Sequence, residues 1–112
     1  SLDAYIFVTP EYNHAPTAAL KNALDYIYTE WNNKAAGFVS YGSMGGARAV
    51  EQLRQIMSEL QIADVRAQVS LSLFTDFENF SVFKPAPMHD TYLNTMIDQL
   101  VAWGEALKTV RK

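Results

Sequence analysis

Short apolar runs alternate with longer stretches of helical spacing, and this alternation limits the chain to few folds. The runs at about residues 2–9, 35–41 and 65–73 are rich in β-branched and aromatic residues, which is typical of strands. In the stretches that follow them, apolar residues recur every three or four positions, as on one face of a helix. Strands that alternate with helices predict an α/β fold with a parallel sheet and right-handed crossovers.

The first apolar run, Leu2 to Thr9, is expected to be a strand buried on both faces, because a short continuous run fits a central strand of a parallel sheet. Pro10 ends it, since proline cannot donate to a sheet ladder. The segment from Pro10 to Pro16 is then a loop at the carboxyl end of that strand. Open α/β sheets bind ligands at that edge, so this loop is a candidate site.

The spacing of apolar residues predicts helices after each strand. The first runs from about Thr17 to Trp31, and the last from Thr91 to about Val110 with Asp90 as its N-cap. The second follows the turn Gly42-Ser43-Met44-Gly45-Gly46, which needs unusual backbone angles. The expected buried stripes are Leu20, Leu24, Ile27 and Trp31; Val50, Leu53, Met57 and Leu60; and Leu93, Ile97, Leu100, Gly104 and Leu107.

Two later segments have different patterns. Val65 to Leu73 alternates apolar and polar residues, which predicts a strand at a sheet edge with one solvated face. The segment from Thr75 to Met88 is rich in phenylalanine, contains two prolines and has no clear period. We expect a loop over the edge of the core there, and a partner interface stays open as an alternative.

Composition excludes several classes of protein. The chain of 112 residues, with 49% hydrophobic and 19% charged residues, is expected to be a single globular domain. A net charge of −3 without a basic stripe gives no reason to expect nucleic acid as a partner. The chain has no cysteine, and its two histidines are far apart in sequence, so we expect no metal site. No apolar run reaches the roughly 18–20 residues of a membrane helix and no signal peptide is visible, so we expect a cytoplasmic protein.

Two loops should meet at the carboxyl edge of the sheet, because they follow neighbouring parallel strands. The first is Pro10-Glu11-Tyr12-Asn13-His14 and the second is Ser40-Tyr41-Gly42-Ser43-Met44-Gly45-Gly46. They offer backbone N–H groups, a glycine surface that permits close approach and a tyrosine ring able to cover a flat ligand. This suits a planar heterocycle with a polar edge, and two ordinary βα turns are the alternative.

The residues of these loops resemble a known family. Thr9-Pro10-Glu11-Tyr12-Asn13-His14, followed by Leu20-Lys21-Asn22-Ala23-Leu24-Asp25, is similar to the signature of the NADPH-dependent FMN reductases, which are flavodoxin-like three-layer α/β/α enzymes. Met44-Gly45-Gly46-Ala47-Arg48 looks like the next loop of that family. The resemblance implies that Pro10, Glu11, Tyr12 and Asn13 border the isoalloxazine of FMN, largely through main-chain groups, and that Ser40, Tyr41, Gly42 and Ser43 line its other side.

The resemblance also implies a chemistry. Hydride passes from NADPH (or NADH) to FMN, and electrons then pass to a quinone, azo dye, metal oxyanion or free flavin. The cofactors carry the reaction, so no catalytic side chain is assigned, and Glu11 is expected to hold the turn more than to donate a proton. Members of the family are usually homodimers or homotetramers, and we expect the same here.

The sequence departs from the family pattern at its beginning. The loop that holds the FMN phosphate in the family, of the type Gly-Ser-x-Arg-x-x-Ser, is absent, and residues 1–112 match the family from its third strand onward. We therefore expect a carboxyl-terminal fragment that lacks the family's first two strands. Its first strand should then be an exposed apolar edge, and this chain alone should bind FMN weakly or not at all.

Two alternatives remain beside the reductase. Ser43 lies between a strand and a helix with Gly45 two residues on, which resembles the nucleophile position of a hydrolase, and Asp76 and His89 follow in the order of a triad. Tyr41 stands where that motif has its first glycine, which argues against it. The other alternative is a flavodoxin-like interaction module that binds no cofactor.

Overall fold

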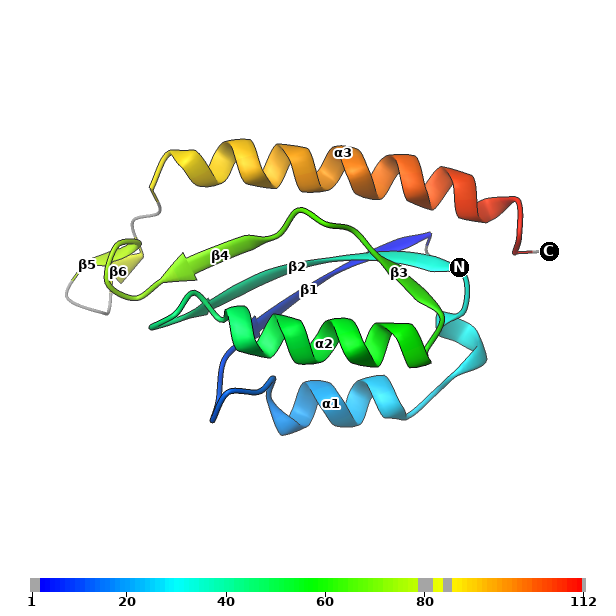
Figure 1. Ribbon diagram of the computed structural model, residues 1–112, viewed down its shortest axis with the longest axis horizontal. Helices are drawn as coiled ribbons and strands as arrows, with labels where there is room; N and C mark the ends of the chain where they lie inside the picture. Colours follow the sequence, from blue (N-terminus) through cyan, green and yellow to red (C-terminus); the bar gives the residue numbers. More distant parts are fainter. Residues whose placement is uncertain (1–2, 79–81, 84–85, 112) are drawn as a thin grey trace.

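The chain forms a parallel sheet with helices on both faces, as the alternating pattern predicts. The computed structural model describes residues 3–78, 82–83 and 86–111. Helices α1 (Ala18–Asp25) and α2 (Ala47–Glu59) cover one face of the sheet, and the long α3 (Met88–Lys108) covers the other (Figure 1). This three-layer arrangement confirms the α/β/α prediction. None of the described helices is both long and apolar enough to span a bilayer.

The sheet is built around β2 (Lys34–Gly42). Strand β1 (Ala4–Pro10) pairs with it in parallel along its whole length. On its other side, β3 (Ile62–Asp64) pairs with the first residues of β2 and β4 (Val69–Ser72) pairs with the last. The carboxyl ends of β1, β2 and β4 therefore lie at one edge of the sheet (Figure 1).

The predicted strand from Val65 to Leu73 was wrong in its start and its continuity. The strand begins at Ile62 and is interrupted between β3 and β4. Arg54 of α2 donates from its guanidinium to the carbonyls of Val65 and Arg66, at 2.9 and 3.2 Å. These two carbonyls therefore bond to a side chain and not to a neighbouring strand. The position of the whole segment at the outer side of β2 agrees with the edge prediction among the described residues.

The first helix is shorter than predicted. It ends at Asp25, and a separate 3₁₀ turn, Thr29–Trp31, follows it. The indole N–H of Trp31 donates to the carbonyl of Leu24 at 3.1 Å, which satisfies a group at the end of the helix. Ile27, expected in the buried stripe, is 38% exposed because it lies beyond the helix.

The last helix begins earlier than predicted. It starts at Met88 after Pro87, so Asp90 lies in its first turn and is not the N-cap. Leu100 and Gly104 are buried, as the stripe predicts, and Met96 beside the stripe is buried too, but Ile97 is 40% exposed. Ile97 lies near Ile6 of β1, which is itself exposed.

Strand β1 is an edge strand of the described sheet, and it is not buried on both faces. The rings of Tyr5 and Phe7 lie on the side of α1, where they pack against Trp31 with centroids 5.0 and 6.0 Å away. On the side of α3, Ile6 and Val8 are 44% and 63% exposed. The prediction of an exposed apolar edge is confirmed.

The aromatic-rich segment contains more regular structure than a loop. Strands β5 (Phe77–Glu78) and β6 (Val82–Phe83) form an antiparallel pair, in which the rings of Phe77 and Phe83 lie 5.2 Å apart. Phe77 packs onto the core on the α3 side, whereas Phe83 is exposed. Phe80 and Pro85, which belong to the same prediction, lie outside the described residues.

Candidate functional site

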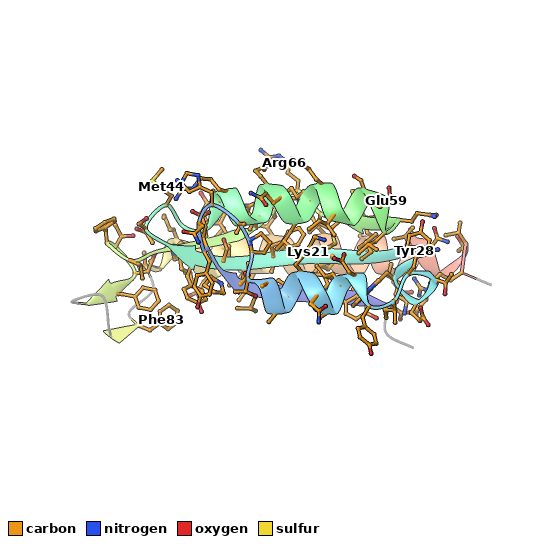
Figure 2. All side chains as sticks on the ribbon, turned by 90° about the horizontal axis from the view of Figure 1, so that it is seen from below. Lys21, Tyr28, Met44, Glu59, Arg66 and Phe83 are labelled. Carbon is orange, nitrogen blue, oxygen red and sulfur yellow. The ribbon has the colours of Figure 1, made fainter. Side chains whose placement is uncertain are left out.

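The two loops predicted to meet do lie side by side. Thr9 and Pro10, at the end of β1, are the register partners of Ser40 and Tyr41 on β2. The segments that follow therefore leave the same edge of the sheet (Figure 1). Figure 2 shows Met44 of the second loop and Phe83 of the β5–β6 pair at this same end of the molecule.

The first loop contains a tight two-residue turn. The N–H of Tyr12 donates to the carbonyl of Ala15 at 2.8 Å, and the N–H of Ala15 donates back at 2.9 Å. Asn13 and His14 between them have φ values of 51° and 67°, which is the left-handed pattern of a type I′ turn. Because the turn is closed by its own backbone, the Tyr12 side chain is left 61% exposed at the edge of the sheet.

The carboxylate of Glu11 points inward, to the start of α2. Its side chain is 5% exposed; Oε2 accepts from Arg48 Nε at 2.7 Å and Oε1 accepts the N–H of Ala49 at 2.9 Å. Burial of the carboxyl by itself raises the pKa of Glu11, but the hydrogen bonds from Arg48 and Ala49 outweigh it and hold that pKa below its ordinary value. Glu11 is therefore ionised near neutral pH, which disqualifies it as a proton donor and agrees with a role in holding the turn.

Residues of α2 grip the far side of the same turn. Arg48 Nη1 donates to Nε2 of His14 at 2.7 Å, and Gln52 Nε2 donates to the carbonyl of His14 at 2.7 Å. No pattern in the sequence predicts these contacts of Arg48 and Gln52. Arg48 and Gln52 are four positions apart and so lie on one face of the helix after the glycine turn. Only the fold shows that this face meets His14.

The second loop is shaped by Ser40 and two glycines. Ser40 is fully buried, and its hydroxyl donates to the carbonyl of Gly45 at 2.6 Å. Gly45 and Gly46 have φ values of 71° and 75°, and a Cβ on Gly46 would lie 2.5 Å from Cβ of Ser40. The predicted need for unusual backbone angles is thus met at Gly45 and Gly46, and glycine is required at the second of them.

The predicted site residues divide into those that face outward and those that support them. Pro10, Tyr41 and Gly42 are partly buried, and Tyr41 packs against the core on the α3 side. Tyr12, Asn13 and Ser43 are exposed, whereas the side chains of Glu11 and Ser40 are enclosed. Contacts of Ser40 with a ligand would therefore have to pass through the main chain.

A third cluster, around Asp76, lies after β4 at the same edge. Asp76 is 1% exposed; Oδ1 accepts the N–H of Ala86 at 2.8 Å and Nε2–H of His89 at 2.9 Å, and Oδ2 accepts the N–H of Ser72 at 2.8 Å. Burial alone raises the pKa of Asp76, but these hydrogen bonds, those from backbone N–H groups first, hold it below its ordinary value. The cluster fastens both ends of the aromatic segment.

The cluster does not complete a hydrolase triad. Asp76 and His89 are paired, as the order of residues in the chain allows, but Ser43 is exposed in another loop. Nδ1 of His89, the nitrogen a nucleophile would have to reach, is buried and has no hydrogen-bond partner in the described part of the chain. The Ser-Asp-His alternative therefore lacks the contact between base and nucleophile that it needs.

Helix N-termini, which commonly bind phosphate, are already occupied in α1 and α2. Oγ1 of Thr17 accepts the N–H of Leu20 at 3.1 Å and caps α1. The Glu11 carboxylate occupies the same position on α2. Within residues 3–78, 82–83 and 86–111 no cluster of three or more acidic, histidine or cysteine side chains suits a metal ion.

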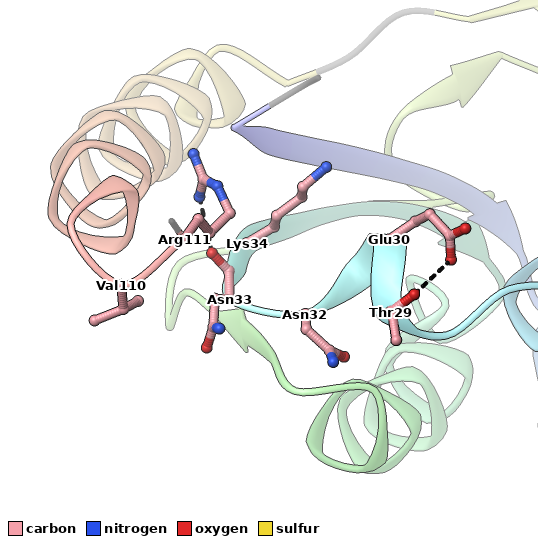
Figure 3. A pocket seen from close by; sticks show the side chains of 7 residues that line it. All are labelled: Thr29, Glu30, Asn32, Asn33, Lys34, Val110 and Arg111. Carbon is pink, nitrogen blue, oxygen red and sulfur yellow. Dashed lines mark hydrogen bonds between the residues drawn. The ribbon is translucent and has the colours of Figure 1, made fainter.

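Two hollows bear on the choice of site. One of about 430 Å³ lies beside the first loop and is lined by Tyr12, Asn13, Lys21 and Gln52 among others. Another, of about 480 Å³, is at the far end of the molecule between the 3₁₀ turn and the carboxyl terminus (Figure 3). Its Arg111 is already bound to Asp3 and to the carbonyl of Asn33, and it lies away from the two loops.

Comparison with known proteins agrees with the family resemblance of the two loops. A family model described as NADPH-dependent FMN reductase matches residues 1–76. The NAD(P)H-dependent FMN reductase LOT6 of Saccharomyces cerevisiae is 47% identical over 62 residues, which are 55% of this chain and 32% of that protein. A quinone reductase of Pseudomonas putida is 32% identical over 120 residues, which are 96% of this chain and 62% of that protein.

A solved structure has the same fold. FerB, a flavoenzyme NAD(P)H:(acceptor) oxidoreductase from Paracoccus denitrificans, superposes with a TM-score of 0.71 at 22% identity, covering 93% of this chain and 62% of that one. The fold is thus flavodoxin-like, and the chain belongs to the NADPH-dependent FMN reductase family. It spans less than two thirds of the length of each of these relatives.

Proposed function

We propose that the chain forms the isoalloxazine side of the FMN site in an NAD(P)H-dependent FMN reductase. The observation that carries the proposal is the pair of interlocked loops at the carboxyl edge, where open α/β sheets bind their ligands. FMN, when bound, takes hydride from NADPH (or NADH) and delivers electrons to an acceptor such as a quinone, azo dye, metal oxyanion or free flavin.

The residues present suit the flat part of FMN. The exposed Tyr12 ring offers an apolar surface, and Pro10, Tyr12 and Asn13 form one wall. Gly42 and Ser43 form the facing wall, and Ser43 is its exposed residue. Glu11 and Ser40 keep these walls in shape from inside, and both loops limit the access of water to the ring.

The phosphate of FMN requires a different place. The side chains of Thr17 and Glu11 already accept the N–H groups of Leu20 and Ala49 in the first turns of α1 and α2, so both helix starts are partly occupied against an anion. We propose that a further segment, supplied by the natural protein or by another chain, pairs with the open edge of β1 and holds the phosphate. The uncovered Ile6 and Val8 support this, because apolar edge strands are ordinarily covered.

Colour tests the main proposal. The protein purified from its natural gene should be yellow, and NADPH should bleach its visible flavin absorbance. A colourless protein that gains no absorbance with added FMN would rule out the reductase and favour a module without cofactor. Labelling of Ser43 by a covalent serine probe would instead revive the hydrolase.

A titration tests the second segment. Residues 1–112 alone should bind FMN weakly or not at all, and sub-micromolar affinity would contradict the need for another phosphate-binding part. A homodimer or homotetramer, a cytoplasmic location and the extent of the domain beyond this chain remain predictions.

A further inference from the structure

One guanidinium holds both sides of the turn that carries Tyr12 and Asn13. Arg48 binds the carboxylate of Glu11, just before these residues, and Nε2 of His14, just after them. Glu11 and His14 belong to the loop after β1 and Arg48 belongs to α2, and the Arg48–Glu11 bond spans 37 positions of sequence. Tyr12 and Asn13 are therefore fastened at both ends to the helix that starts at the second loop.

The ion pair differs from an ordinary surface pair. The Glu11 side chain is 5% exposed and its other oxygen accepts the N–H of Ala49, so it cannot swing away without leaving a helix N–H unpaired. By contrast, the pair Lys21–Asp25 on α1 is about half exposed on both sides, at 49% and 51%. Exposed pairs of that kind contribute little to stability.

We infer that Glu11 and Arg48 are positioning residues that set the distance between the two walls of the flavin site. The inference rests on the proposed function for its ligand. Arg48 and Ala49 belong to the first turn of α2, which follows directly from Gly45 and Gly46 of the second loop. A contact between Glu11 and this turn therefore ties the Tyr12 wall to the Gly42 wall from inside the molecule.

The planar fork of arginine is essential to this arrangement. Nε faces Glu11 and Nη1 faces His14, so a single side chain makes two directed contacts on opposite sides of the turn. A lysine at position 48 keeps the charge but offers one ammonium, which cannot reproduce both contacts. Charge and geometry can thus be separated by comparing Arg48→Lys with Arg48→Met.

The experiment uses the natural protein and its Glu11→Gln, Arg48→Lys and Arg48→Met variants. We measure the FMN dissociation constant, the visible circular dichroism of bound FMN, and amide exchange at Tyr12, Ala15 and Ala49 without FMN. Asp25→Asn is the matched control, because it breaks an exposed pair of the same charge type. Thermal unfolding without FMN reports any general loss of stability.

Both arginine variants should weaken FMN binding about tenfold or more and alter the dichroism of the bound flavin. The double variant Glu11→Gln/Arg48→Met should bind FMN about as weakly as Arg48→Met alone, since Arg48→Met already removes the contact between the two side chains. Amide exchange at the three positions should rise together, and Asp25→Asn should change nothing.

The inference is overturned if the arginine variants bind FMN as the natural protein does with unchanged dichroism, even when they unfold earlier. If Arg48→Lys bound FMN as tightly as the natural protein does, the guanidinium geometry of Arg48 would not be needed. A natural protein that binds no FMN defeats the proposed function itself, and amide exchange then still decides whether Glu11 and Arg48 couple the loops. The two failures are therefore distinguishable.

Discussion

Glu11 and Asp76 are both enclosed carboxylates at the carboxyl edge of the sheet, yet they are held by different kinds of partner. Glu11 is held by Arg48, whose side chain is 41% exposed, and by one helix N–H. Asp76 is held by two backbone N–H groups and by His89, whose side chain is 9% exposed. The side-chain partner of Glu11 is therefore largely open to water, whereas His89 beside Asp76 is nearly enclosed.

The two carboxylates therefore differ in how costly their contacts are to break. When the link through Arg48 breaks, the guanidinium stays solvated, and the enclosed Glu11 carboxylate loses one partner but keeps the N–H of Ala49. A link through buried N–H groups is costly to break, because each group left unpaired loses about 1–3 kcal/mol. We therefore expect the Asp76 cluster to determine the stability of this edge and the Glu11 pair to determine the geometry of the candidate flavin walls.

Asp76→Asn should have the largest effect on stability. Both oxygens of Asp76 face donors, so an amide NH₂ in either orientation points at an N–H that needs an acceptor. We expect a loss of roughly 3 kcal/mol or more in the free energy of unfolding, measured by urea denaturation. A loss within about 0.5 kcal/mol, the range of the surface control Asp25→Asn, would contradict this account.

Glu11→Gln should cost less. The amide oxygen can still accept the N–H of Ala49, while Arg48 turns to water, so we expect roughly 1 kcal/mol in the free energy of unfolding. Its effect should be larger on exchange of the Ala49 amide than on global unfolding. If Glu11→Gln proved as destabilising as Asp76→Asn, the contrast between the two carboxylates would fail.

Both carboxyls should make the stability of the fold sensitive to acid. The pKa of each carboxyl is held below its ordinary value of 3.8 for Asp76 and 4.5 for Glu11, so each stabilises the fold above that value. This stability is lost as the pH falls through the lower folded-state pKa. Unfolding measured from about pH 6 to 2 should therefore lose stability on the acid side, with a smaller loss in Asp76→Asn and in Glu11→Gln than in the unmutated chain. Parallel acid curves for both variants and the unmutated chain would contradict this.

Hydrophobic patterning was enough to predict the parallel sheet and the meeting of two loops. Strand-like runs such as Ala35–Tyr41 are local in sequence, and parallel pairing then brings their carboxyl ends to one edge. Motif resemblance added the family, which the match over residues 1–76 confirms. The role of the individual loop residues in FMN binding stays a prediction.

The errors share a physical cause, which is long side chains that reach distant backbone. Arg54 interrupts the strand near Val65, and the Trp31 indole takes a carbonyl at the end of α1. Neither contact leaves a periodic signal in the sequence. The exposure of Ile97 has a different origin. Ile97 lies near Ile6 on the uncovered side of β1, and the helical spacing of α3 does not encode that exposure.

The smallest expected effect is at His14, and it isolates the turn from the ion pair. His14 has a φ of 67°, a conformation that costs a residue with a Cβ about 1 kcal/mol relative to glycine. Both His14→Gly and His14→Ala remove the contact with Arg48 but keep the carbonyl that Gln52 binds. Their difference in free energy of unfolding therefore reports the backbone alone.

We expect His14→Gly to be close to the unmutated chain, since relief of the left-handed strain offsets the lost contact with Arg48. His14→Ala should be less stable than His14→Gly by about 1 kcal/mol in urea denaturation. Equal stability of the two variants would mean that residue 14 is not held in the left-handed region. The type I′ turn would then not be what presents Tyr12, and the Glu11–Arg48 pair would have to orient that wall without it.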